Sequence, residues 1–340
     1  MQSEIPRVVL LVIDQLAGHW VPGAATVQST GLPPPNIMDY HKHGLIPNIS
    51  ECINNGLWTL RPMSQGKCMT PYGMRYLASG RYDSHQVVLE DEWCCHPYAD
   101  GDYRTICEWI DRNRPDIKVA TFGSGCWLAP GYWHTTQHCV PLPGYYPDEK
   151  ELTEYVFPYA RANPDWRFLM IYLPEHDLTA KPYGLPVSVP DPETPVSDKH
   201  HHLVDHVDRH VGMLRDFLTE TGAWDDVLMV ITSDHAYHYG CDAMSGSFRP
   251  HDGPRTSTEL CWDHVWPWDC KVWDFSSNRP ISRGWSDCCR RITQIVTGGA
   301  LPLAMRGTTR EHGDICDAAA TVAGALGIPF KCAGESIVSL

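Results

Sequence analysis

The hydrophobic residues of this chain form short continuous runs. The first predicted strand, Ile5–Ile13, contains six consecutive apolar residues, and similar runs occupy Phe168–Leu173 and Val227–Thr232. Continuous runs of this length, rather than an alternation of apolar and polar residues, are typical of strands buried on both faces of a parallel sheet. We therefore predict three central strands here, and a fourth at Ile117–Phe122.

Helical patterns lie between these runs. Between His200 and Thr221, apolar residues recur on one helical face: Leu203, Val207, Val211, Leu214 and Leu218. Shorter helices are expected within 47–56, 70–80 and 102–113. Strands that alternate with helices predict an α/β fold with a doubly wound, mostly parallel sheet flanked by helices, which we assign to residues 1–340 as a single domain.

The segment 236–291 departs from this pattern. It has little periodicity and combines Pro, Gly and Cys with five tryptophans: Trp262, Trp266, Trp268, Trp273 and Trp285. We interpret it as an irregular insertion in the α/β domain that forms a wall or cap over a site.

Composition and charge narrow the classes of function. The 340 residues are 43% hydrophobic and 20% charged, with a formal net charge of −14 and no long block of Lys and Arg, which argues against a nucleic-acid partner. No apolar run approaches the roughly 18 residues of a membrane span, and the N-terminus lacks the pattern of a signal peptide. We expect a cytoplasmic protein whose 14 cysteines stay reduced; the sequence makes no prediction about its oligomeric state.

Acidic residues stand where three of the predicted strands end. Asp14 follows the first strand directly, Asp177 follows Phe168–Leu173, and Asp234 is joined to His235 after the last run. The carboxyl ends of parallel strands share one edge, where ligands bind in such sheets. Carboxylates beside an imidazole favour zinc, manganese or iron over calcium, so the sequence predicts a transition-metal site at this edge.

Further motifs accompany these residues in a fixed order along the chain. They are Thr70-Pro71, the run Leu77–Tyr82, the Ser233-Asp234-His235 peptide and the closing segment Asp314–Val322. Together they resemble the alkaline phosphatase superfamily, which includes nucleotide pyrophosphatases/phosphodiesterases, phosphonate hydrolases and sulfatases. The resemblance covers most of the chain. It implies a metal-dependent hydrolase or transferase acting on a small anionic substrate, namely a phosphoester, phosphodiester or phosphonate.

The resemblance also implies a nucleophile. In the superfamily this residue stands nine positions before a Ser- or Thr-Gly pair, and counting back from Ser79-Gly80 leads to Thr70. A metal held between Asp14, Thr70, Asp234 and His235, with zinc as the leading choice, would stabilise the alkoxide. The alternative for Thr70 is an ordinary helix N-cap.

A second metal, which two-metal members bind, lacks its histidine ligands in this chain. Lys181 stands four residues after Asp177, where such members have a histidine, and Arg283 takes the place of their distant histidine. A protonated lysine cannot coordinate a metal. We predict one ion rather than two, with the two cations neutralising Asp177 and binding anionic oxygens of the substrate.

Other histidines remain open as metal ligands. His312 is the main alternative for the distant position, and His251, His264 and His176 are further candidates. A separate group with helical spacing is expected to lie on a solvated helix face: His202, His206 and His210.

Two other functions fit the same fold. In the first, the site processes a sulfate, sulfamate or carboxylate substrate in a biosynthetic pathway. In the second, the protein binds an anion without catalysis. Sulfatases carry a modified Cys or Ser at the nucleophile position, where this chain has Thr70, and a pure binding protein has no need of a nucleophile. Both observations favour phosphoryl chemistry.

Overall fold

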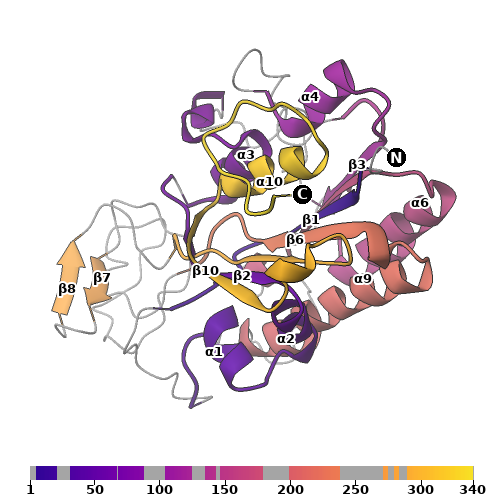
Figure 1. The fold of residues 1–340 in the computed structure, drawn as a ribbon. Coiled ribbons are helices and arrows are strands. Elements are labelled where there is room, and N and C mark those ends of the chain that lie inside the picture. The colour runs from indigo at the N-terminus through magenta and orange to yellow at the C-terminus, as the bar shows by residue number, and fades with distance from the viewer. Residues whose placement is uncertain are drawn as a thin grey trace.

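A computed structural model gives the structure of the protein and describes residues 5–20, 31–66, 68–87, 104–124, 135–142, 146–178, 199–237, 271–274, 279–282 and 289–339. Its centre is an eight-stranded sheet in the order β10-β2-β9-β6-β1-β5-β3-β4 (Figure 1). The strands are β1 (Arg7–Ile13), β2 (Leu57–Met63), β3 (Val119–Ser124), β4 (Cys139–Leu142), β5 (Phe168–Leu173), β6 (Val227–Thr232), β9 (Gln294–Thr297) and β10 (Thr308–Asp314).

Helical segments connect the strands. They are α1 (Ile37–Lys42), α2 (Pro47–Asn54), α3 (Thr70–Ser79), η1 (Tyr82–Val87), α4 (Ile106–Asn113), α5 (Asp148–Glu151), η4 (Leu152–Val156), α6 (Phe157–Ala162), α7 (Glu175–Leu178), η5 (His202–Val207), α9 (Asp208–Glu220), η6 (Trp224–Asp226), η7 (Leu303–Met305) and α10 (Asp317–Ala325). Within the described ranges, every helix is too short or too polar to cross a membrane.

The strand pairing confirms the predicted fold class. β1 pairs in parallel with β5 on one side and β6 on the other, and β3 pairs in parallel with β5 and β4. β9 is the exception, because it runs antiparallel to both β2 and β6. The predicted limits of β5 and β6 agree with the structure, whereas β1 begins at Arg7, two residues later than predicted.

The sheet separates two hydrophobic cores. Alternate residues of β1 point to opposite faces: Val8, Leu10 and Val12 pack with residues of α3, α4 and α10, whereas Val9 and Leu11 pack with residues of α2, α6 and α9. Figure 1 shows these helices in two layers, one on each side of the sheet. Burial on both faces is the physical reason why the central strands are continuously apolar.

The predicted insertion falls largely outside the described residues. Of the segment 236–291, the structure describes a two-stranded antiparallel unit, β7 (Lys271–Asp274) with β8 (Arg279–Ser282), and the short stretches at either end. The role of this segment as a wall or cap therefore stays a prediction.

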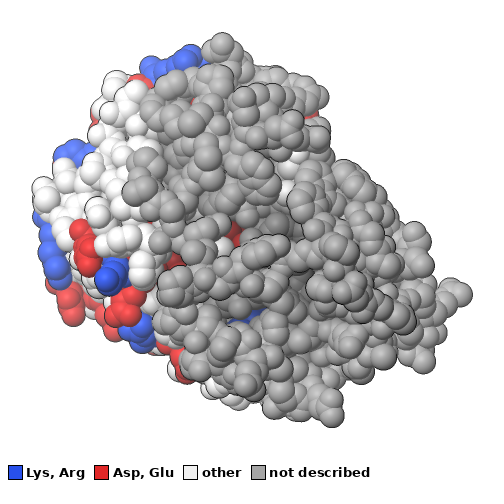
Figure 2. Space-filling model, turned by 180° about the vertical axis from the view of Figure 1, so that it is seen from behind, with Lys and Arg blue, Asp and Glu red and all other residues white. Residues whose placement is uncertain are grey.

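The outer surface carries both signs of charge. On the face shown in Figure 2, acidic and basic side chains of the described residues are interspersed rather than gathered into one basic patch. This distribution agrees with a sequence that has no long block of Lys and Arg.

Two of the three regularly spaced histidines of η5 and α9 are not solvated, contrary to the sequence-based expectation, whereas His206 is partly exposed. His202 and His210 are each only 1% exposed, and they lie near the buried carboxyl of Glu175, whose Oε2 is 3.8 Å from His202 Nε2. The rings of His202 and His206 stack with their centroids 5.0 Å apart. The helix packs against α7, so the face that the spacing assigned to solvent is covered by other polar residues.

Burial sets the protonation of this group. It lowers the pKa of His210 to about 3 and that of His202 well below its usual range, because a buried imidazolium loses its hydration. Burial likewise raises the pKa of the Asp148 and Glu151 carboxyls well above their usual range, and the charge of Glu175 adds to both shifts. Burial thus disfavours the charged form of each of these side chains.

The raised pKa of Glu151 predicts a pH-dependent effect of Glu151→Gln on stability. The pKa of this carboxyl is 4.5 in the unfolded protein and higher in the folded protein. Such a group contributes most to stability at pH values below 4.5, and the contribution is lost as the pH rises toward the pKa of the folded state. Glutamine does not ionise, so the variant should gain stability relative to the wild type between about pH 5 and about pH 8. Urea unfolding at both pH values measures the difference, with exposed Glu220→Gln as control; an equal difference at both would contradict the prediction.

Candidate metal centre and nucleophile

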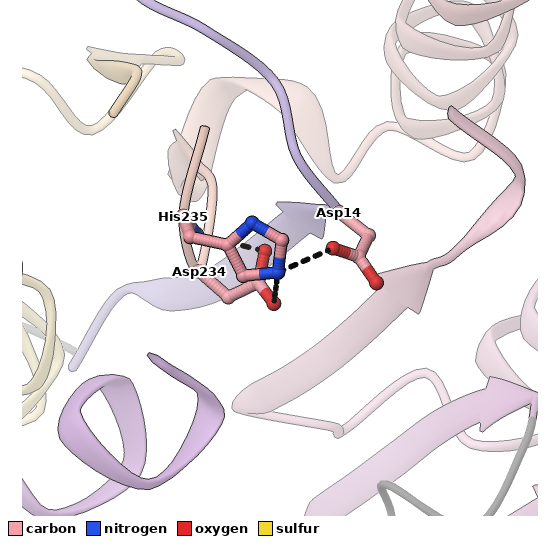
Figure 3. A group of neighbouring side chains, drawn as sticks. All are labelled: Asp14, Asp234 and His235. Carbon is pink, nitrogen blue, oxygen red and sulfur yellow. Dashed lines mark hydrogen bonds and ion pairs between the residues drawn. The ribbon is translucent and has the colours of Figure 1, made fainter. Parts of the chain in front are cut away.

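Three potential metal ligands converge at the carboxyl edge of the sheet (Figure 3). His235 Nε2 lies 3.4 Å from Asp14 Oδ1 and 3.4 Å from Asp234 Oδ2, and all three side chains are buried. Among the residues that the structure describes, this is the one set of at least three His, Cys, Asp or Glu side chains whose ligand atoms all lie within 4.8 Å of one another. It contains both residues of the predicted Asp-His pair.

Strand register brings the two carboxylates together. Val12 of β1 is paired with Thr232 of β6, so Asp14 and Asp234, each two residues further on, leave neighbouring strands at the same level. The backbone N–H groups of Gln15 and His235 donate to Asp234 Oδ1 over 3.2 and 2.9 Å. This oxygen is thereby satisfied. Asp234 Oδ2 faces His235 instead and has no hydrogen-bond donor among the described residues.

The imidazole of His235 is oriented by its own backbone. Nδ1 lies 3.0 Å from the carbonyl oxygen of Ala236, which accepts but does not donate, so Nδ1 carries a proton. In the neutral ring Nε2 then presents its lone pair to the two carboxylates. A ring nitrogen fixed in this way by a carbonyl is the usual arrangement for a metal-binding histidine.

The site gathers negative charge in a buried place. Burial raises the pKa of Asp234 to about 7, and the nearby charge of Asp177 adds to the rise. Burial, together with the charge of Asp14, also raises the pKa of Tyr172 well above its usual range. Two buried carboxylates facing an imidazole lone pair need a compensating cation. The donor set, two oxygens and one nitrogen, fits a divalent transition metal such as zinc, manganese or iron.

Thr70 lies beside these ligands rather than capping its helix. It is the first residue of α3, the N-cap is Met69, and no side chain caps the helix. Thr70 Oγ1 is 3.3 Å from Asp14 Oδ2, to which it donates, and 3.2 Å from His235 Nε2. Its position at the start of α3 also places it at the positive end of the helix dipole, where anions are favoured. The N-cap alternative is therefore not what the structure shows.

The remaining predicted site residues are distributed differently. Asp177 is buried in α7, just beyond β5, and is not one of the three converging ligands. His312 lies exposed on the edge strand β10 and does not belong to them either. His176 is buried with its Nδ1 3.3 Å from Nδ1 of His202. Four candidates lie outside the described residues: Lys181, Arg283, His251 and His264.

Two residues of the site escaped sequence reasoning. The hydroxyl of Tyr172 donates to Asp14 Oδ2, although Tyr172 lies within a continuous apolar run and was interpreted as core. Gln15 has φ 61°, a left-handed backbone that is uncommon for residues other than glycine. Its side chain is buried, and neither amide atom has a hydrogen-bond partner among the described residues. The sequence offers one signal for Gln15, namely that a polar residue directly follows Asp14.

The sequence was compared with known families. A profile of the type I phosphodiesterase/nucleotide pyrophosphatase family matches residues 8–244, a range that includes Asp14, Thr70, Asp234 and His235. The chain belongs to this family. No curated protein matches the chain in sequence.

Solved structures show the same fold for this phosphodiesterase-family chain. Murine ectonucleotide pyrophosphatase/phosphodiesterase 5, as an inactive threonine-to-alanine variant in complex with AMP, superposes with a TM-score of 0.61 at 12% identity, covering 97% of each chain. A phosphonate monoester hydrolase of Agrobacterium radiobacter gives 0.59 at 14% identity, covering 98% of this chain and 76% of the other. A sulfatase from a Pseudoalteromonas species gives 0.55 at 15%, covering 98% and 71%. The predicted membership of the alkaline phosphatase superfamily is thus confirmed.

The contact between α3 and the Asp234 loop predicts the effect of Gly73→Ala. A Cβ atom at Gly73 would lie 2.3 Å from the backbone oxygen of Asp234, so alanine must push the helix that carries Thr70 away from the ligand loop. We expect a loss of about 1–3 kcal/mol in the free energy of unfolding, as for other overpacked cores, and weaker metal binding. Denaturant unfolding and metal titration measure the two effects.

A matched control for this substitution is Gly324→Ala. Gly324 is an exposed residue of α10, and an added Cβ would have the exposed Ser336 side chain as its near neighbour among the described residues, at 3.0 Å. Alanine there should maintain or raise stability because it is the better helix former. Equal stability of the wild type and the Gly73→Ala variant would show that α3 does not press on the Asp234 loop.

Proposed function

We propose that this protein is a metal-dependent hydrolase or transferase of phosphoesters, phosphodiesters or phosphonates in which Thr70 is the nucleophile. The observation that supports this most directly is the position of Thr70 Oγ1, 3.2 Å from His235 Nε2 and 3.3 Å from Asp14 Oδ2. A hydroxyl in van der Waals or hydrogen-bond contact with two candidate metal ligands lies where its alkoxide would be stabilised. Family membership supports phosphoester chemistry in general.

The reaction has two steps on this proposal. Thr70 Oγ1 forms a bond to phosphorus while the bond from phosphorus to the leaving group breaks, and the hydroxyl proton passes to Asp14 Oδ2, its hydrogen-bond acceptor. Water or another hydroxyl acceptor then attacks the phosphothreonine, the bond from phosphorus to Thr70 Oγ1 breaks, and Thr70 regains the proton held by Asp14. The first leaving group takes a proton from solvent, and the acceptor releases one to it. A divalent metal held by Asp14, Asp234 and His235 supplies positive charge for the alkoxide and the phosphoryl oxygens.

Two cationic residues complete the proposed site. Lys181 and Arg283, both outside the described residues, take the place of the histidines that bind a second metal in two-metal relatives. They would neutralise Asp177 and bind non-bridging or leaving-group oxygens, the arginine through a bidentate fork. One metal ion, most simply zinc, with manganese or iron as alternatives, is then sufficient.

The structural neighbours support the choice of substrate class. The murine neighbour is an inactive threonine-to-alanine variant in complex with AMP, and another neighbour is a phosphonate monoester hydrolase. Their shared chemistry is attack on a tetrahedral phosphorus. Because one neighbour is a sulfatase, a sulfate ester is the second candidate substrate. The first experiment is therefore to test the protein on a panel of aryl phosphate, phosphodiester, phosphonate and sulfate esters. Turnover of the sulfate ester alone would replace the leading proposal.

Thr70→Ala should lower the turnover rate about a thousandfold or more while leaving the metal content unchanged. The substitution deletes the nucleophile but none of the three converging ligands. Steady-state kinetics on the best substrate of the panel, with metal analysis of the same samples, measures both effects. Thr59→Ala, which removes another buried hydroxyl on β2, is the control. Retained turnover in Thr70→Ala would show that another group attacks phosphorus.

Removal of the metal should abolish turnover, and zinc or manganese should restore it. We expect about one equivalent of tightly bound metal per chain, because one group of ligands converges in the described part of the structure. Asp234→Asn should lose this metal, since a neutral amide replaces a charged ligand. Elemental analysis of the purified protein gives the count, and a value close to two equivalents would contradict the role proposed for Lys181 and Arg283.

A further inference from the structure

Tyr172 is the strongest feature of the site that the proposed mechanism does not use. It lies near the carboxyl end of β5, in register with Val12 of β1 on one side and Gly123 of β3 on the other. Its side chain is fully buried. A residue paired on both sides in the centre of a sheet has little freedom, so its hydroxyl is delivered to one fixed point.

That fixed point is one oxygen of Asp14. The Tyr172 hydroxyl donates to Asp14 Oδ2, the same oxygen that accepts from Thr70 Oγ1. The other oxygen, Oδ1, faces His235 Nε2 at 3.4 Å. The two oxygens of this carboxylate thus have different partners. Oδ2 accepts from two hydroxyl groups, and Oδ1 faces the other candidate metal ligands.

The terminal torsion of an aspartate side chain is broad and has no strong preferred setting of its own. Thr70 alone is a weak anchor for Asp14, because its hydroxyl is also 3.2 Å from His235 and changes its bonding during the proposed reaction. Tyr172 makes and breaks no covalent bond in that reaction, and the Asp14 carboxyl keeps acceptor capacity for the phenol even while it carries the Thr70 proton. The phenol is therefore a constant partner that helps to hold Asp14 in one orientation.

We propose that Tyr172 is a positioning residue that fixes the Asp14 carboxylate, so that Oδ1 is presented to the metal while Oδ2 faces Thr70. The inference rests on the proposed function, because it assigns Asp14 to the metal. Partners of this kind, which hydrogen-bond a ligand without touching the metal, typically change metal affinity or activity about 10- to 100-fold when removed.

Tyr172→Phe tests the proposal, since it deletes the hydroxyl and keeps the ring. We expect Zn²⁺ affinity, measured by calorimetric titration of the metal-free protein, to fall about 10- to 100-fold. With saturating Zn²⁺, kcat should fall while KM changes little, because Tyr172 holds a ligand and not the substrate. The matched control is Tyr40→Phe, which removes another buried phenol, bonded to His200 Nδ1 over 2.8 Å, and should leave Zn²⁺ affinity unchanged.

The outcomes separate this proposal from the proposed function. If Tyr172→Phe binds Zn²⁺ as tightly as the wild type, or if both Tyr→Phe variants lose stability and neither loses affinity, Tyr172 is only a core residue and the proposal is overturned. If the wild type binds Zn²⁺ but hydrolyses no ester of the panel, the proposed function fails, and the difference in Zn²⁺ affinity between the two variants still supports the positioning role.

Discussion

The pairing of β1 with β5 and β6 is the constraint on which the site depends. These three strands are paired over six consecutive residues at each junction, and their side chains are buried on both faces. A slip of one residue would turn every side chain to the other face and carry Asp14 about 3.3 Å along the strand. The continuous burial of Val8–Ile13 and its neighbours therefore fixes the register, and the register fixes the distance between Asp14 and Asp234. The stability of the core is what maintains a group of carboxylates that would otherwise repel one another.

The sequence predicted the parts of the site that follow directly from this constraint. Asp14 directly follows one apolar run, and the Asp234-His235 pair follows another after a single serine. Their meeting at one edge could therefore be argued from the parallel direction of the strands. The edge strand β10 was not predicted, since its residues Thr308–Asp314 include no Val, Ile, Leu, Met, Phe, Tyr or Trp, and its pairing with β2 is a backbone interaction. Tyr172 was assigned to the core for the opposite reason, because an aromatic residue within a buried run gives no sign in sequence that its hydroxyl has a partner.

Features that depend on the tertiary fold were beyond the pattern of the sequence. The spacing of His202 and His210 placed them correctly on one helical face, but which face meets α7 is decided by how the helix docks. Gln15 combines a left-handed backbone with a buried amide that lacks a hydrogen-bond partner among the described residues. Each is a local cost, and such costs persist where the surrounding structure imposes them, commonly at functional sites. Here the N–H of Gln15 bonds Asp234, so the strained residue is part of what orients a ligand.

The fold leaves the choice of substrate to side chains at the site. Neighbours with TM-scores of 0.55 to 0.61 include a phosphodiesterase-family protein, a phosphonate hydrolase and a sulfatase, all at 12–15% identity. One scaffold thus serves phosphorus and sulfur chemistry, as is common for widely used folds. The family match supports phosphoester chemistry for this chain. The position of Thr70 beside Asp14, Asp234 and His235 is consistent with that chemistry. On the proposed mechanism, Thr70 supplies the attack and the three ligands hold the metal that stabilises charge. On this proposal, discrimination between substrates comes from groups around them, among which the resemblance to two-metal enzymes points to Lys181 and Arg283.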